Sequence, residues 1–352
     1  MSHFQGKNIV ITGGSDGIGK ALVMQFLALG ARVATCGRNQ QKLTDLQKEC
    51  NSDHLMVFTA DVSKKEDCEA FVHAAIQQLG GIDVLINNAG ISMRALVSEV
   101  KVETLKQVMD INFWGTVYTT MAALPSIKEH NGVIVGVSSI AGYRGLPGRS
   151  GYSASKYALN GWLEALRTEL YGSGTHVMWV CPGFTSSNIR NAALDKDAKA
   201  QGESPMDEGA MMSSEECATH IIHAIEKSKI DTTLARLVPV PSSTSSQRRR
   251  GRSFIVDLVT TISQRTGIQM LDCLRLSRRV LDQSGLHRDE RATNLAGAFR
   301  ITSHARGELI LIDDVVTTGA TLQEAVRAVN SQGFHAAGSV SAVTACVAQP
   351  LR

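Results

Sequence analysis

The feature that most constrains the fold is a regular alternation of two kinds of segment between residues 7 and 180. Short apolar segments rich in β-branched residues, typical of buried strands, are separated by longer segments with the apolar spacing of helices. Successive strand–helix–strand units form right-handed crossovers, so the sequence predicts a doubly wound parallel α/β sheet. The predicted strands are Lys7–Ile11, Ala31–Thr35, His54–Thr59, Val84–Ile86, Gly132–Val137 and Val177–Val180.

The longer segments of this region predict helices and one loop of functional interest. Thr185–Ser214 is polar with several Ala and Met residues, and we expect a flexible substrate lid there. A closing helix is predicted over Ser213–Lys229. The other main helices are predicted up to Leu29 and over Lys64–Leu79, Val102–Leu124 and Tyr152–Tyr171.

Length and basic-residue usage predict two domains, 1–230 and 231–352. The chain has 352 residues, more than one ordinary core requires. Residues 1–230 contain 14 Lys and 7 Arg, whereas residues 231–352 contain no Lys and 15 Arg. Chance or a local need for guanidinium groups can explain this difference. We favour different genomic origins, through a natural gene fusion or an artificial splice.

The remaining bulk properties are those of a cytoplasmic protein. No apolar run approaches the roughly 18–20 residues needed to cross a bilayer, and no signal peptide is evident at the N-terminus. The seven cysteines are scattered and never form a C-x-x-C pair, so neither a disulfide framework nor a zinc site is indicated. We expect a cytoplasmic location and no metal in the first domain.

A glycine-rich turn follows the first predicted strand and begins a helix. Its sequence is Thr12-Gly13-Gly14-Ser15-Asp16-Gly17-Ile18-Gly19. Glycines there let backbone amides approach a pyrophosphate at the positive end of the helix. Taken alone, such a turn can equally be a tight strand–helix connection.

Several further motifs follow in order, and together they resemble the short-chain dehydrogenase/reductase superfamily over roughly residues 5–230. They are Asn87-Asn88-Ala89-Gly90 at a strand end, then Asn112, Ser139, Tyr152-Ser-Ala-Ser-Lys156 and Pro182-Gly183. The resemblance implies a Rossmann-type domain and transfer of a hydride between a nicotinamide cofactor and a carbonyl or alcohol. It also implies a homo-oligomer, which we expect to assemble through the helices at 102–124 and 152–171.

The resemblance assigns a catalytic tetrad. Tyr152 exchanges a proton with the substrate oxygen, and Lys156 assists it and holds the ribose. Tyrosine has a free pKa of about 10, and Lys156 lies one helical turn away, so we expect its ammonium to lower the pKa of Tyr152. Ser139, 13 residues before Tyr152, is favoured over its neighbour Ser138 to bond the same oxygen. Asn112 is expected to hold a water that links Lys156 to solvent.

Cofactor choice depends on the end of the second strand. Arg38 suits a 2′-phosphate and therefore favours NADP(H), although it can instead stack on adenine. Asp61 and Val62 resemble an adenine-contacting pair, but Asp61 can also cap the segment from Ser63. The other residues expected to contact cofactor are Gly13, Ser15, Asp16, Gly17, Ile18, Gly19, Asn88, Ala89, Gly90, Pro182 and Gly183.

A second phosphate-binding signature lies near the C-terminus, where an apolar strand at 309–312 leads into acidic and hydroxyl residues. With Val238-Pro-Val-Pro241 it resembles ComF-like type I phosphoribosyltransferases over about 236–347, which implies PRPP and Mg²⁺. Such proteins normally carry further residues before Val238, so we expect a smaller, incomplete domain. Asp313 and Asp314 can alternatively belong to a capped turn. The expected PRPP-binding residues are Asp313, Asp314, Thr317, Thr318, Gly319 and Thr321.

Two rival functions remain open at this stage. Residues 231–352 can dominate as a transferase or nucleotide-binding domain, with the Arg-rich run at 248–252 binding polyphosphate or nucleic acid; such a run can also be a solvated loop. Alternatively, the chain is a non-catalytic hybrid of two truncated parts. Whether Leu234–Val240 supplies a further strand to the first sheet cannot be decided from the sequence.

Overall fold

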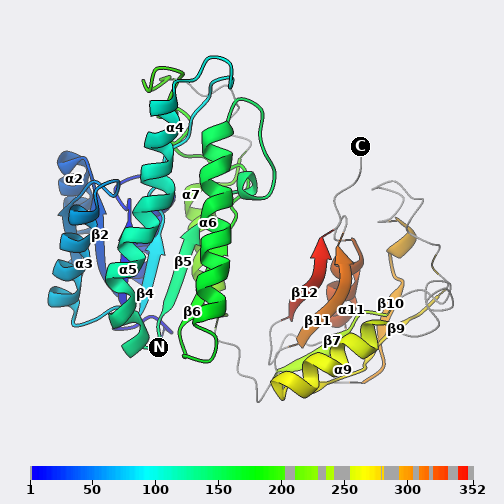
Figure 1. The fold of residues 1–352 in the computed structure, drawn as a ribbon. Coiled ribbons are helices and arrows are strands. Elements are labelled where there is room, and N and C mark those ends of the chain that lie inside the picture. Colours follow the sequence, from blue (N-terminus) through cyan, green and yellow to red (C-terminus); the bar gives the residue numbers. More distant parts are fainter. Residues whose placement is uncertain are drawn as a thin grey trace. The chain divides into compact units, whose positions relative to one another are not determined.

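The structure is a computed structural model, and it divides into two compact units, Met1–Lys229 and Ile230–Arg352. It describes residues 2–202, 211–228, 235–241, 254–278, 280, 293–303, 309–316, 320–331 and 340–347. Figure 1 shows the chain, and each unit is considered by itself below. None of the described helices has both the length and the apolar character needed to cross a bilayer.

The first unit is built on a six-stranded sheet in the order β3-β2-β1-β4-β5-β6, with every pair parallel. This confirms the predicted doubly wound α/β fold. The strands are β1 (Asn8–Thr12), β2 (Arg32–Gly37), β3 (Leu55–Thr59), β4 (Val84–Asn87), β5 (Val133–Val137) and β6 (His176–Val180). The helices are α1 (Gly17–Ala28), α2 (Gln40–Cys50), α3 (Lys65–Leu79), α4 (Val102–Met109), α5 (Gly115–Glu129), α6 (Ser150–Glu169) and α7 (Ser214–Glu226).

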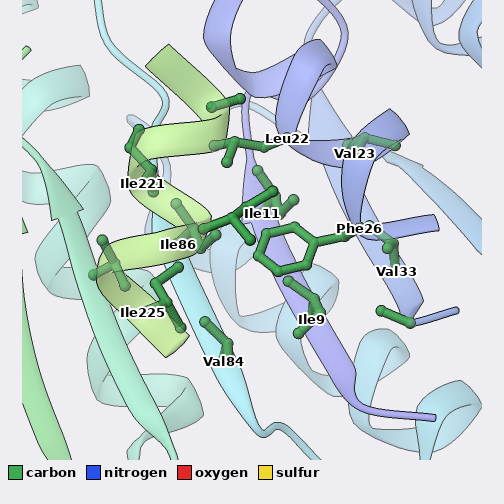
Figure 2. Packing of buried hydrophobic residues seen from close by; sticks show 14 of the residues in the cluster. Ile9, Ile11, Leu22, Val23, Phe26, Val33, Val84, Ile86, Ile221 and Ile225 are labelled. Atoms are coloured by element: carbon green, nitrogen blue, oxygen red, sulfur yellow. The ribbon is translucent and has the colours of Figure 1, made fainter. Parts of the chain in front are cut away.

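The two faces of this sheet bury alternate residues of the same strands. Ile9 and Ile11 of β1 face α1 and α7, whereas Val10 belongs to the cluster formed with α3, α5 and α6. Figure 2 shows the first of these clusters, in which Phe26 and Ile225 approach β1 from two helices. Because side chains alternate across a strand, a continuous apolar strand is stable only when both of its faces are covered.

The helix predicted over Val102–Leu124 is interrupted. A π-helical turn, η1 (Asp110–Trp114), separates α4 from α5. At the start of α5, a Cβ on Gly115 would lie 3.0 Å from Val62, so this end of the helix packs closely against the segment after β3. The extra residue in a π turn is a tertiary adjustment that helical periodicity does not encode.

Arg236–Pro239 forms β7, and this strand belongs to the second unit. It pairs in parallel with β11 (Leu309–Val316), not with β6. The four-stranded sheet has the order β12-β11-β7-β8 and includes β8 (Gln269–Met270) and β12 (Val340–Val347). The described residues of this segment therefore add no strand to the first sheet.

The remaining described elements of the second unit complete a small α/β fold. Helices α9 (Phe254–Thr266) and α11 (Ala320–Asn330) each contribute to an apolar cluster, through Val259 and Val329 respectively. An antiparallel pair, β9 (Leu274–Leu276) and β10 (Phe299–Ile301), lies beside them in the fold. The strand predicted to end at Ile312 continues to Val316, because Val315 and Val316 pair with β12.

Candidate active site

The glycine-rich turn is closely packed at the end of β1. Gly13 has a φ of +71°, and a Cβ on it would lie 2.9 Å from the Cα of Ala89. A Cβ on Gly19 would lie 2.2 Å from the carbonyl oxygen of Gly13. Asp16 caps α1, since its carboxylate accepts a 2.8 Å hydrogen bond from the Gly17 amide. The first amides of a helix have no intrahelical acceptor, so this turn can bind a phosphate.

Thr12 and Asn88 fix this turn to the end of β4. The Asn88 side-chain amide donates to the carbonyl oxygens of Thr12, at 3.0 Å, and Gly13, at 3.1 Å. The Thr12 hydroxyl in turn accepts from the amides of Asn88 and Ala89, at 3.1 and 3.0 Å. Sequence reasoning assigned Thr12 no role beyond its place in the motif. In the structure, Thr12 and Asn88 support the glycine turn, and Gly90 follows directly.

The end of β2 carries the groups expected to select the cofactor. Arg38 is exposed, and within the described ranges it takes part in no ion pair. A Cβ on Gly37 would lie 3.1 Å from the Ser15 hydroxyl, so the strand end and the glycine turn are adjacent. An available guanidinium beside a glycine cradle and the positive end of α1 fits a phosphorylated dinucleotide.

Asp16 places a negative charge in the same turn, and Lys42 compensates it. Burial opposes ionisation of the Asp16 carboxyl, but its hydrogen bond and charge interaction with Lys42 lower the pKa of Asp16 on balance. The Lys42 amine lies 2.5 Å from the carboxylate. Because Lys42 compensates the Asp16 carboxylate, the turn should repel a bound phosphate only weakly.

Asp61 caps the turn that follows it in the structure. Its carboxylate accepts hydrogen bonds from the Ser63 amide, at 3.1 Å, and the Ser63 hydroxyl, at 2.8 Å. The capping alternative for this residue is thus present, and contact with adenine stays a prediction. Val62 is buried against Gly115.

Tyr152 and Ser139 come together through their hydroxyl groups, which are hydrogen-bonded to each other. Ser139 follows β5 and is half-buried. Its neighbour Ser138 is buried, and the Ser138 hydroxyl donates a 2.5 Å hydrogen bond to Asn160. The geometry therefore presents Ser139, and not Ser138, to Tyr152.

Lys156 does not acidify Tyr152 in this structure, contrary to the expectation from sequence. Burial raises the pKa of Tyr152, opposed by the Ser139 hydrogen bond and by the charges of Arg149 and Arg190. Burial also lowers the pKa of Lys156 to about 8. The Lys156 amine lies 5.8 Å from the centre of the Tyr152 ring and donates to the Val137 carbonyl oxygen at 2.8 Å. Desolvation outweighs the nearby hydrogen bond and charges, so the phenol stays protonated at neutral pH.

Asn112 lies in the π turn and hydrogen-bonds both the segment after β4 and helix α6, which carries Tyr152. Its side chain donates to Ser155, at 2.9 Å, and to the Ile91 carbonyl oxygen, also at 2.9 Å, while its oxygen accepts from the Ile91 amide at 2.8 Å. Ser155 in turn donates to the carbonyl oxygen of Tyr152 at 2.8 Å. Ser155 is a supporting residue that sequence reasoning did not single out. The water proposed for Asn112 stays a prediction.

Pro182 and Gly183 follow β6, and the residue before them belongs to the same cluster of groups. Cys181 is half-buried, and burial raises the pKa of its thiol, opposed by the Ser138 hydrogen bond and the charge of Lys156. The predicted lid makes backbone hydrogen bonds nearby. The Leu194 amide donates to the carbonyl oxygen of Ser92, and the Arg94 amide donates to the carbonyl oxygen of Leu194. Part of Thr185–Ser214 is therefore fixed to the segment after β4.

The second predicted site is only partly within the described residues. Asp313 is buried within β11 and makes an interaction of its own, and Asp314 is the next residue of the strand. Both residues thus belong to the strand and not to the segment after it. Thr321 lies in the first turn of α11. Thr317, Thr318, Gly319 and the Arg-rich run at 248–252 lie outside the described residues.

Comparison with known proteins agrees with the geometry of the first unit. The family model for short chain dehydrogenase matches residues 7–198, and the chain therefore belongs to this family. It is 33% identical to dehydrogenase/reductase SDR family member 7B of Xenopus laevis over 249 residues, which cover 68% of this chain and 76% of that protein. It is 39% identical to 11-beta-hydroxysteroid dehydrogenase 1A of Arabidopsis thaliana over 191 residues, 53% of this chain and 54% of that protein.

Solved structures show the same fold. A short chain dehydrogenase/reductase from Burkholderia phymatum in complex with NAD has a TM-score of 0.57 at 23% identity, covering 65% of this chain and 88% of that one. An alcohol dehydrogenase from Thermococcus sibiricus complexed with 5-hydroxy-NADP has a TM-score of 0.56 at 24% identity, covering 62% and 90%. None of these matches shows a phosphoribosyltransferase domain, so that resemblance stays a prediction.

Proposed function

We propose that the first unit is an NADP(H)-dependent oxidoreductase that interconverts a carbonyl compound and its alcohol. The observation that carries this proposal is the hydrogen bonding between the buried Tyr152 and the half-buried Ser139, which follows β5 at the carboxyl end of the sheet. Ligands of doubly wound sheets bind at that end. The glycine turn on α1 and the exposed guanidinium of Arg38 support NADP(H) over NAD(H).

The proposed chemistry requires one proton donor and one positioning hydroxyl. When bound, the nicotinamide supplies or accepts the hydride. Tyr152, kept protonated by its burial, donates its phenolic proton to the carbonyl oxygen during reduction and takes it back during oxidation. Ser139 bonds the same oxygen, and the Lys156 amine lies where it can hold the cofactor ribose.

The test is cofactor-dependent turnover by the full chain. Purified protein is assayed with NADPH and with NADH against a panel of ketones and aldehydes, following absorbance at 340 nm, and cofactor binding is measured by calorimetry. We expect NADPH to bind more tightly than NADH and to be oxidised only when a carbonyl compound is present. Folded protein that binds neither cofactor would refute the assignment.

We also propose that the first unit forms a homo-oligomer through α4, α5 and α6. Trp114 and Met121, on η1 and α5, and Tyr157, on α6, are 42%, 65% and 48% exposed, an unusual share of large apolar surface for a monomer. Sedimentation velocity of the wild type and of Met121→Glu tests this: the variant should shift toward the monomer, and a monomeric wild type would contradict it. A cytoplasmic location stays a prediction.

For the second unit we propose binding of a phosphoribosyl diphosphate with Mg²⁺, without base transfer. Support comes from β11, whose Asp313 and Asp314 precede α11 across only a few residues in a parallel sheet. PRPP with Mg²⁺ should raise the melting temperature of the wild type but not of Asp313→Asn. An equal shift in both proteins, or none in either, would contradict the proposal.

A further inference from the structure

Two arginine residues lie on adjacent backbone segments, and the charge of one of them, Arg149, acts on Tyr152. Arg149 immediately precedes α6, one helical turn before Tyr152, and its guanidinium donates to the Ser92 hydroxyl at 3.3 Å. Arg94 comes from the segment after β4, which runs beside Arg149 because Ala95 and Arg149 form a parallel bridge. Both side chains are half-buried.

The loop before α6 brings the Arg94 side chain to the same place. The Ala95 amide donates to the Gly148 carbonyl oxygen at 2.9 Å. A Cβ on Gly148 would lie 4.0 Å from Cγ of Arg94. Arg94 and Arg149 therefore extend from adjacent backbone segments.

Arg190 adds a third guanidinium from the described part of the predicted lid. It is 5% exposed, and its Nη2 donates to the Thr185 carbonyl oxygen at 2.6 Å. Burial lowers the pKa of Arg149, and the charges of Arg94 and Arg190 lower it further. The charges of Arg149 and Arg190 also act on Tyr152. Arg149 thus interacts electrostatically with Arg94, with Arg190 and with the phenol.

The positive charge of Arg94 and Arg149 has no carboxylate partner within the described ranges, where neither takes part in an ion pair. Nη2 of Arg94 is buried and has no hydrogen-bond partner among the residues that the structure describes. Met93, which precedes Arg94 in the sequence, forms one buried apolar cluster with Tyr152 and Leu194. Buried guanidinium groups are costly unless an anion compensates them, so this arrangement suits a charged ligand.

We propose that the substrate carries an anionic group, a carboxylate or a phosphate, which Arg94 and Arg149 bind while its carbonyl group lies at Tyr152. This rests on the proposed reductase function and specifies its substrate class. Arg149 caps α6 three residues before Tyr152, and three residues of α-helix rise about 4.5 Å along the axis. A compact molecule with an anion a few bonds from its carbonyl carbon can therefore reach both. Guanidinium groups bind carboxylates and phosphates through paired hydrogen bonds.

The experiment compares matched substrate pairs that differ only in charge. The carboxylate pair is 4-oxopentanoate and its methyl ester; the phosphate pair is dihydroxyacetone phosphate and dihydroxyacetone. We expect the anionic member of at least one pair to have a kcat/KM at least ~10-fold higher, the size of one charged hydrogen bond. The pair with the larger ratio identifies the anion. A neutral member that reacts as well as its anionic partner in both pairs would overturn the proposal.

Variants separate anion binding from folding. Arg94→Gln and Arg149→Gln should each lower kcat/KM for the anion by ~10-fold or more, mainly through KM, and should lower it less for the neutral partner. Arg149→Lys keeps the charge and should retain part of the preference. Arg144→Gln, on an exposed residue of the same loop, is the matched control and should change neither. Equal losses for charged and neutral substrates would show a structural role only.

A binding measurement keeps the anion site testable apart from catalysis. If the wild type reduces no carbonyl compound, the proposed function fails, and calorimetry with phenylphosphonate and phenylacetate then tests the arginines alone. Binding by the wild type and Arg144→Gln, with loss in Arg94→Gln and Arg149→Gln, would support the site. Binding that is equal in all four proteins, or absent from all, would exclude it.

Discussion

The two halves of the candidate active site are built by different means. Around the glycine turn, close backbone packing shapes the site, and the side chains of Thr12 and Asn88 serve mainly to fix main-chain groups. Around Tyr152, buried side chains with shifted pKa values make up the site. We therefore expect cofactor binding to depend on close backbone packing around the glycine turn. Turnover should depend on the protonation of buried side chains around Tyr152.

The sharpest way to break this comparison is Tyr152→Phe. Loss of the phenolic proton should reduce kcat by about 10²–10⁴-fold, the usual contribution of a general acid, while the dissociation constant for NADPH stays unchanged. Steady-state assays and calorimetry measure the two quantities separately. Tyr157→Phe, at a half-exposed position on the same helix, is the control and should keep full activity. Retained turnover in Tyr152→Phe would remove the assigned acid.

Lys156→Met tests whether the buried amine near Tyr152 lowers the free energy of unfolding of the protein. Burial lowers the pKa of Lys156 to about 8 in the folded protein, from 10.5 for a free lysine, so folding penalises its protonated form. This penalty is full below pH 8 and disappears as the pH rises toward 10.5. At pH 7 the variant should therefore have a higher free energy of unfolding than the wild type, by up to about 3 kcal/mol. Loss of the hydrogen bond to the Val137 carbonyl oxygen reduces this gain.

Urea denaturation at pH 7 and pH 9.5 measures this difference, which should shrink at the higher pH. Lys128→Met, at an exposed position on α5, is the control and should show no such trend. A variant that is less stable than the wild type at both pH values would contradict the desolvation argument.

On the cofactor side, Arg38→Asp should reverse the preference between cofactors. Removing the guanidinium and adding a carboxylate should weaken NADP⁺ binding by ~10–100-fold, since a charged hydrogen bond contributes about 1.5–3 kcal/mol. The carboxylate can accept from the ribose hydroxyls of NAD⁺, so binding of NAD⁺ should not fall. Arg38→Gln isolates the loss of positive charge. Equal effects on both cofactors would indicate that Arg38 stacks on adenine.

The smallest expected effect comes from a pair of glycine substitutions. In Gly19→Ala the new methyl group meets the Gly13 carbonyl oxygen and should destabilise the protein by ~1–3 kcal/mol and weaken cofactor binding. In Gly161→Ala, on α6, nothing lies within 4 Å of the new Cβ, so stability should rise by ~0.5–1 kcal/mol. Urea denaturation measures both, and a stabilising Gly19→Ala would show that the turn is not closely packed.

The catalytic half was only partly predictable. The spacing between Tyr152 and Lys156 indicates a shared helix face, and the structure places both on α6. The direction of the Tyr152 pKa shift was predicted wrongly, because it depends on how completely the phenol is desolvated. The roles of Ser155 and Arg94 were also not predicted. Ser155 accepts a hydrogen bond from Asn112 in the π turn, and the segment of Arg94 lies beside Arg149 because Ala95 pairs with it.

The sequence by itself determined the order of strands and helices in the first unit, the glycine turn and the family, since these follow from local periodicity and short motifs. Only the tertiary structure decided that Arg236–Pro239 pairs with β11, that Asp61 caps its own turn, and that the segment of Arg94 lies beside Arg149. Strand partners, burial and the sum of charges around a buried group depend on residues far apart in the chain. Local sequence patterns do not carry that information.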